Sequence, residues 1–241
     1  MTAENIKVEI LRHPQKEDWE RCKMLALNTV GKKYMGSEID EKWKKQILNA
    51  GHSPIRTLMF TIRMEIPYYV STHFVRHKVG VEHYVQSQRN DRQSKYDREL
   101  APQSAMVSHI MDINAEQLMF MSHRRLCGQA DETTRYVMTL ICLKVIKINP
   151  EFNGFLVPMC EHLGRCPEFK SCNHWKEVQK NKSQKIIEIN PDFGFYIDAN
   201  DGYCPCAIER TEDTLCMCKE FREQEEGVCH CGRYKKVKVK S

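Results

Sequence analysis

The residues richest in possible chemistry lie between positions 76 and 89. The stretch reads R-H-K-V-G-V-E-H-Y-V-Q-S-Q-R and gathers cations, imidazoles, amides and a hydroxyl. Arginine binds phosphate through paired hydrogen bonds and keeps its charge throughout the physiological range of pH. Several such donors at one cleft indicate a site for an anionic ligand that carries a planar polar ring. The alternative left open by spacing alone is an ion-paired helix end at the surface.

Two predicted elements would hold this stretch in place. Residues 57–64 alternate between apolar and polar types, which predicts a half-buried strand that Pro67 ends. Residues 68–75 then predict a short helix that runs directly into Arg76. A strand followed by a helix is a rigid platform of the kind that a precise binding site needs. The polar residues 92–106 predict a loop.

The rest of the first 150 residues predicts helices and one further strand. Apolar residues recur at helical spacing over 18–30, 39–49, 113–125 and 131–148, and residues 6–11 alternate as a strand does. Separate strands and helices of this kind predict an α+β fold. A polar run at 177–185 predicts a linker, so we expect one domain over 1–176 and a small module over 186–241.

Composition excludes several classes of protein. The chain has 241 residues, 41% of them hydrophobic, a net charge of +5 and a mean hydropathy of -0.58. No apolar run is long enough for a membrane-spanning helix, and the mild charge does not indicate nucleic acid binding. The first residues lack the basic and apolar regions of a signal peptide, so we expect a cytoplasmic protein without a membrane partner.

The twelve cysteines are unevenly placed, because nine of them follow residue 159. In a reducing cytosol, clustered cysteines indicate metal ligands or redox thiols instead of structural disulfides. A first group could bind zinc or could be free thiols: Cys160, His162, Cys166, Cys172 and His174. A second group forms three C-x-C pairs after residue 203. The small module around those pairs could bury little apolar core, so a metal is expected to stabilise it.

The sequence resembles a known family over roughly residues 1–175. Its F-V-R-H-K at 74–78, followed by Q-S-Q-R at 86–89, is similar to the R-H-R-x7-S-x-R signature of flavin-dependent thymidylate synthases. Further matches are Ser53-Pro54, Phe60-Thr61-Ile62, Asn114-Ala115, and Arg125 with the run from Gln129 to Arg135. Departures from the family pattern are Thr57, His73, Lys78, Val81, Glu116 and a spacer before Ser87 that is one residue longer.

The resemblance implies roles for individual residues. Flavin contacts would come from Arg76, His77, Lys78, Arg125 and Gln129, and nucleotide contacts from His73, Ser87, Arg89 and Arg135. Arg135 would also be catalytic, because it would stabilise the enolate formed when the pyrimidine C5 becomes nucleophilic. The family's fold has a mixed sheet and long helices. Its members are homotetramers whose sites are shared between subunits.

The implied activity is FAD-dependent methylation of dUMP to dTMP, with methylenetetrahydrofolate and NADPH as co-substrates. Two alternatives remain open on the sequence alone. One keeps the fold but acts on another pyrimidine nucleotide. The other is a non-catalytic, ligand-binding descendant of the fold with a zinc-stabilised interaction module.

The C-terminal cysteines resemble the catalytic chain of ferredoxin–thioredoxin reductase. That resemblance implies a [4Fe–4S] cluster on Cys204, Cys216, Cys218 and Cys229, and a redox pair formed by Cys206 and Cys231. A ferredoxin or a thioredoxin-like protein would then be the redox partner. Zinc in the same thiolate cage is the alternative.

Overall fold

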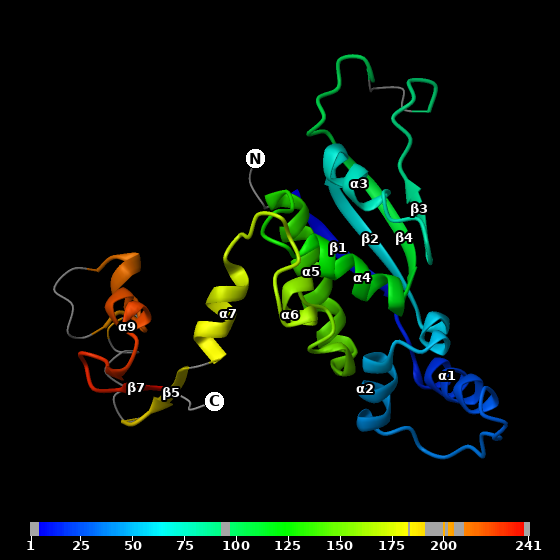
Figure 1. Cartoon of the computed structure of the whole chain (residues 1–241). Helices are drawn as coiled ribbons and strands as arrows, with labels where there is room; N and C mark the ends of the chain where they lie inside the picture. Colours follow the sequence, from blue (N-terminus) through cyan, green and yellow to red (C-terminus); the bar gives the residue numbers. More distant parts are fainter. Residues whose placement is uncertain are drawn as a thin grey trace. The chain divides into compact units, whose positions relative to one another are not determined.

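The computed structural model describes residues 5–92, 97–182, 184–190, 200, 202–204 and 210–238 (Figure 1). The chain divides into two compact units, residues 1–172 and residues 173–241. The sequence predicted a boundary at residue 176 and a linker over 177–185. Residues 174–182 instead form helix α7 (His174–Lys182) of the second unit. Within the described residues, no helix is both long and apolar enough to cross a membrane.

A four-stranded sheet forms the framework of the first unit. Its order is β1 (Lys7–Arg12), β2 (Met59–Pro67), β4 (Met106–Asn114) and β3 (Val81–Val85). All three strand pairs are antiparallel. The predicted α+β class is confirmed, whereas the expected mixed sheet is wrong, because β3 turns back after helix α3 and pairs antiparallel with β4.

The first unit also contains helices, and three of them begin with the side-chain caps that their sequences provide. The helices are α1 (Lys16–Asn28), α2 (Glu41–Ala50), α3 (Tyr68–Phe74), α4 (Ala115–Arg125), α5 (Glu132–Ile148) and α6 (Met159–Leu163), with 3-10 turns η2 (Ser53–Thr57) and η3 (Pro150–Phe152). Asp40, Asn114 and Asp131 each accept a hydrogen bond from a backbone N–H in the first turn of the helix that follows.

The core lies between the sheet and helices α4 and α5 (Figure 1). Alternate residues of β2 are fully buried, including Phe60, Ile62 and Met64, and they meet the buried face of α5. Burying each such side chain contributes about 1.5–3 kcal/mol to folding. This packing fixes the ends of β2 and α4, from which the site residues extend.

The second unit is built on a small antiparallel sheet of order β5 (Gln184–Glu188), β7 (Tyr234–Lys238) and β6 (Gly227–Val228). It also contains the 3-10 turn η5 (Glu212–Thr214) and the helix α9 (Lys219–Glu223). Lys236 is buried, and its Nζ donates to the carbonyl oxygens of Arg222 at 2.7 Å and Gln224 at 3.1 Å. Those carbonyls end α9, so the lysine fastens that helix to the sheet.

Candidate functional site

The turn after α3, residues 75–80, carries the R-H-K residues, and we call it the anchored turn. Buried Phe74 ends α3, and His77 N donates to the Phe74 carbonyl oxygen at 3.0 Å. Arg76 and Lys78 are exposed, whereas His77 is buried. The turn therefore presents one cation on each side of a buried imidazole ring.

Gly80 closes the anchored turn in a conformation that requires glycine. Its φ is +70°, and an added Cβ would overlap the side-chain amide of Asn114. The Gly80 carbonyl oxygen accepts from Asn114 N at 3.0 Å, and the Asn114 side chain caps α4 by accepting from Gln117 N at 2.9 Å. One asparagine thus joins the turn to the helix that carries Arg125.

The His77 ring is held by two side chains of α4. Arg125 Nε donates to His77 Nε2 at 3.1 Å, so that nitrogen is an acceptor and the neutral ring carries its proton on Nδ1. Gln117 Nε2 lies 3.1 Å from Nδ1, and because Nδ1 carries the proton, the amide must be turned over so that its oxygen accepts. Burial, followed by the charge of Arg125, lowers the pKa of His77 to about 4. The ring is therefore neutral at physiological pH.

Arg125 joins the anchored turn to α3 and lacks an acidic partner among the described residues. Its guanidinium also donates to the His73 carbonyl oxygen. Burial and the nearby charge of Arg76 lower the pKa of Arg125. No carboxylate forms an ion pair with Arg76, Lys78 or Arg125 within the part of the chain that the structure describes. Three cations without a described counter-charge form a site suited to an anion.

A second group of predicted residues lies at the corner between α4 and α5. Arg135 donates to the carbonyl oxygens of Gly128 and Ala130, each at 3.3 Å, and Gln129 Nε2 donates to the Lys170 carbonyl oxygen at 3.1 Å. His73 lies near this corner, because the charges of both Arg125 and Asp131 act on it, although burial is the main cause of its lowered pKa.

Tyr69 fastens this corner to α3, since its hydroxyl donates to Thr133 Oγ1 at 2.9 Å. The structure therefore gathers most of the predicted site residues around the ends of α3, α4 and α5: His73, Arg76, His77, Lys78, Arg125, Gln129 and Arg135.

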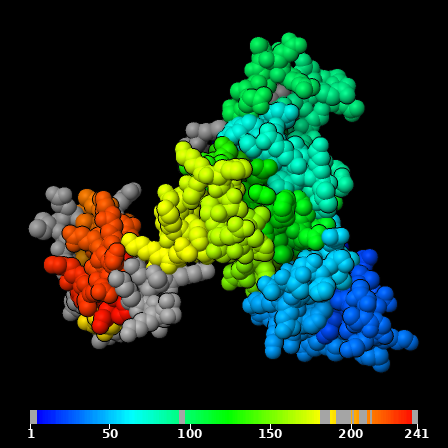
Figure 2. Space-filling view, in the orientation of Figure 1, coloured from blue at the N-terminus to red at the C-terminus, as the bar shows by residue number. Residues whose placement is uncertain are grey.

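Ser87 and Arg89 lie apart from that group. They belong to the chain between β3 and β4, residues 86–92 and 97–105, which we call the projecting segment because it stands out beyond the sheet (Figures 1 and 2). Arg89 pairs with Asp91 at 2.7 Å, and its backbone N–H donates to Ser87 Oγ at 3.3 Å. These contacts are local, and within the described residues Ser87 and Arg89 make no contact with the anchored turn.

The C-terminal cysteines are only partly described, since Cys206 lies outside the described residues. The Sγ atoms of Cys229 and Cys231 are 3.4 Å apart, and Tyr234 N donates to Cys229 Sγ at 3.1 Å. Burial raises the pKa of Cys216, with smaller contributions from neighbouring thiols, among them Cys218. Cys204 also acts on Cys231, whose pKa is raised to about 12, chiefly by burial.

The five predicted thiols that are described thus lie in one neighbourhood. A thiolate cage would suit their chemistry. However, no set of three or more Cys, His, Asp or Glu side chains among the described positions is arranged to hold a metal ion. The predicted ligands and redox pair therefore stay predictions.

The structure also brings together residues that the sequence did not connect. Cys127 acts electrostatically with Cys166 and Cys172, and the Cys172 side chain packs against Gly128. His83 and His109 are in direct contact, with Nδ1 of the first 2.9 Å from Nε2 of the second. Recognising β4 as a strand would have identified His109, because it sits among alternating buried residues.

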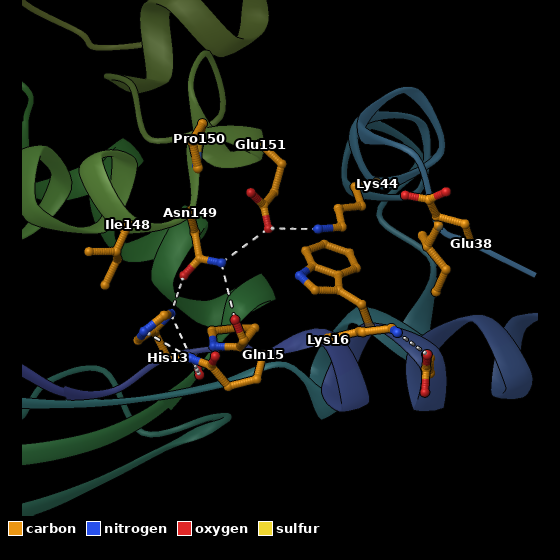
Figure 3. Close-up of a pocket in the computed structure, with 13 residues that line it drawn as sticks. His13, Gln15, Lys16, Glu38, Lys44, Ile148, Asn149, Pro150 and Glu151 are labelled. Atoms are coloured by element: carbon orange, nitrogen blue, oxygen red, sulfur yellow. Dashed lines mark hydrogen bonds and ion pairs between the residues drawn. The ribbon is translucent and has the colours of Figure 1, made fainter.

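The pocket in Figure 3 is separate from all of these residues. It has a volume of about 370 Å³ and lies where the start of α1, α2 and the end of α5 meet. Asn149 connects its walls by donating to Glu151 Oε1 at 3.1 Å and contacting His13 Nδ1 at 2.9 Å, and Lys44 pairs with Glu151 at 3.7 Å. None of the predicted site residues lines it. Most of the polar contacts on its walls are made between wall residues, although the buried Trp19 Nε1 has no hydrogen-bond partner in the described structure.

Comparison with known proteins finds similarity among solved structures alone. No protein-family model and no curated protein sequence matches the chain. A crystal structure of the UMP/dUMP methylase PolB from Streptomyces cacaoi, bound with 5-Br dUMP, is similar with a TM-score of 0.48 and 17% sequence identity. The alignment covers 63% of this chain and 97% of that chain.

Proposed function

We propose that the first unit is a flavin-dependent enzyme that methylates dUMP to dTMP, with FAD as cofactor and with methylenetetrahydrofolate and NADPH as co-substrates. The observation that carries the proposal is the arrangement around Arg125. This half-buried arginine holds a neutral His77 and the end of α3, and it shares its surroundings with Arg76 but with no described carboxylate.

The residues present fit an anionic flavin nucleotide. Arg76 and Lys78 are exposed on either side of His77, where they could contact the diphosphate or the polar edge of the ring. Arg125 and Gln129 would complete that side. When bound and reduced by NADPH, the flavin would supply the hydride that converts the transferred methylene to a methyl group.

The protein's own part in the reaction would be electrostatic. Arg135 already points its guanidinium at the corner between α4 and α5, where it donates to two backbone carbonyls. From there it would exchange those weak bonds for the pyrimidine carbonyl and stabilise the negative charge that develops as C5 becomes nucleophilic. His73, on the adjoining face of α3, would orient the nucleotide.

Ser87 and Arg89 support a site shared between subunits. They belong to the signature, yet the projecting segment holds them away from Arg125 in the described chain. A homotetramer in which one chain's Ser87 and Arg89 bind the nucleotide at another chain's anchored turn would bring both parts together. Arg89 would exchange Asp91 for the nucleotide phosphate, because an exposed ion pair of this kind contributes at most about 1 kcal/mol.

For the second unit we propose a metal-stabilised redox module. Cys204, Cys216, Cys218 and Cys229 would bind a [4Fe–4S] cluster or zinc, and Cys206 and Cys231 would form the redox pair. The support is the C-x-C spacing together with the common neighbourhood of the described thiols. A ferredoxin or thioredoxin-like protein would be the redox partner.

One observation favours another pyrimidine nucleotide as a second candidate substrate. Glu116 occupies the position where the family motif has arginine, and it pairs with Arg56, whose Nε lies 2.8 Å from its carboxylate. A carboxylate in place of a cation near the start of α4 would change which groups on the nucleotide are accepted.

The test is anaerobic purification followed by an optical spectrum, metal analysis and a tritium-release assay with dUMP. Bound FAD and release of tritium from C5 would support the proposal. FAD binding without release from dUMP would support the second candidate substrate, and release from another pyrimidine nucleotide would establish it. A chain that neither carries nor takes up FAD would contradict both. About four irons per chain would support the cluster, whereas stoichiometric zinc without iron would refute it.

A further inference from the structure

Beneath the anchored turn lies a pair of histidines from two neighbouring strands. His83 of β3 is half-buried, and His109 of β4 is fully buried. His83 Nε2 is 2.8 Å from the His77 carbonyl oxygen, and His83 Nδ1 is 2.9 Å from His109 Nε2. The two rings therefore form a continuous connection from the core of the sheet to the backbone of the anchored turn.

The chemistry of these contacts fixes where the protons are. A carbonyl oxygen only accepts, so His83 must donate from Nε2. In the neutral ring, His83 Nδ1 is then an acceptor, and His109 must donate to it from Nε2. His109 Nδ1 is left as a bare lone pair, and this atom is buried without a hydrogen-bond partner in the described structure.

Burial keeps the second ring neutral. Burial and the neighbouring His83 lower the pKa of His109 to about 4. A buried polar atom without a partner has a cost in stability. His109 Nδ1 therefore lowers stability, while Nε2 of the same ring donates the hydrogen bond that orients His83.

We propose that His83 and His109 are a positioning pair, which holds the anchored turn in the conformation that presents Arg76, His77 and Lys78 to the cofactor. The identity of that cofactor rests on the proposed function, whereas the pair itself does not. His77 is then fixed twice, through its carbonyl by His83 and through its ring by Arg125 and Gln117.

The proton arrangement can be tested without any ligand. Long-range ¹H–¹⁵N NMR spectra of the full chain with labelled histidines would show His83 and His109 with the proton on Nε2, and His77 with the proton on Nδ1. Removing each histidine in turn would assign the signals. A proton on Nδ1 of His83, or an average of both tautomers at His83, would overturn the proposal.

Two substitutions at one position test the positioning role. His109→Phe fills the space but removes the donor, so we expect the dissociation constant of FAD to rise about tenfold. His109→Gln keeps an N–H donor near the position of Nε2, and we expect binding within about twofold of the unmodified chain. Val107→Ala is the matched control, because Val107 is buried on the same face of β4. It should lower stability and leave FAD binding within about twofold.

Equal FAD binding by His109→Phe and the unmodified chain would overturn the positioning role while leaving the proposed function intact. If the unmodified chain binds no FAD, the proposed function fails, and the tautomers still decide whether the pair exists. Should His109→Phe not fold, the NMR measurement on the unmodified chain decides the question.

Discussion

The two ends of the stretch from residue 76 to residue 89 are held in different ways. The anchored turn is fixed by hydrogen bonds from β3, from Asn114 and from α4, and those made by side chains are part-buried. The projecting segment holds Ser87 and Arg89 through contacts with near neighbours on an exposed loop. Residues that are close in sequence therefore do not form one structural unit. From this difference we expect the anchored turn to form a rigid cofactor side of the site, and the projecting segment to form an adaptable nucleotide side.

Acid should have the largest effect, and it should act through the buried histidines and not through the projecting segment. His77, His109 and also His123 of α4 have pKa values lowered to about 4, mainly by burial, from an ordinary value of 6.5. Because folding favours their neutral forms, their contribution is complete above about pH 6.5 and is lost as the pH falls toward 4. We expect the free energy of unfolding to fall by on the order of 5 kcal/mol between pH 7 and pH 5.

Urea unfolding at a series of pH values would measure this loss. Replacing His109 by glutamine removes one titrating ring and should flatten the curve between pH 6.5 and pH 4. A curve that is level over this range in the unmodified chain would contradict the buried, neutral state of these histidines.

Arg125→Met should have the next largest effect. It removes the donors to the His77 ring and to the His73 carbonyl, together with a cation that has no described counter-charge, so FAD binding should weaken about a hundredfold. Arg124→Met is the control, because Arg124 is exposed on the same helix and lies 3.9 Å from Glu168. Fluorescence titration with FAD would compare them, and equal losses would show that Arg125 has no special position.

Gly80→Ala tests how rigidly the anchored turn is closed. The new methyl group would overlap Asn114 and the backbone would be strained at φ +70°, so we expect a loss of about 2–3 kcal/mol in the free energy of unfolding. Gly36→Ala has a similar φ of +76° but open space around the new methyl group, so its loss should be about 1 kcal/mol. Denaturant unfolding of the two variants measures the difference, and similar losses would mean that Asn114 moves aside.

Arg89→Gln should have the smallest effect on the fold. Arg89 pairs only with an exposed neighbour in the described residues, so stability should change by less than about 0.5 kcal/mol and FAD binding should be unchanged. Nucleotide binding, measured by calorimetry with dUMP, should weaken about tenfold. Asp91→Asn is the control, which should leave dUMP binding intact or slightly tighter. Loss of FAD binding in Arg89→Gln would show that the two regions are not separate.

The sequence predicted the strand and helix that position the site better than it predicted the side-chain contacts within the site. The strand predicted over 57–64 and the helix predicted over 68–75 were confirmed as β2 (Met59–Pro67) and α3 (Tyr68–Phe74), because each depends on a local pattern and on Pro67. The strands β3 and β4 were not predicted. β3 is a short edge strand with Glu82 and His83 at its centre, and β4 buries a histidine among its apolar residues. Neither shows a clear strand pattern alone, so the two are recognised only once they pair in the sheet.

The contact between Arg125 and His77 could not be read from the sequence, since it spans 48 residues and depends on how α4 packs. The resemblance identified both residues without showing that they touch. His109 was missed for the same reason, because its role exists only once β3 and β4 are side by side. The helical structure of α7 was not predicted, because an exposed helix is as polar as the linker that was predicted over 177–185.

The most direct test of the account is an anaerobic titration of the purified full chain with FAD, followed by flavin fluorescence and the visible spectrum. We predict that each chain binds one FAD and that Arg125→Met abolishes the spectral change at concentrations that saturate the unmodified chain. A colourless chain that takes up no added FAD would contradict the assignment of the anchored turn as a flavin site.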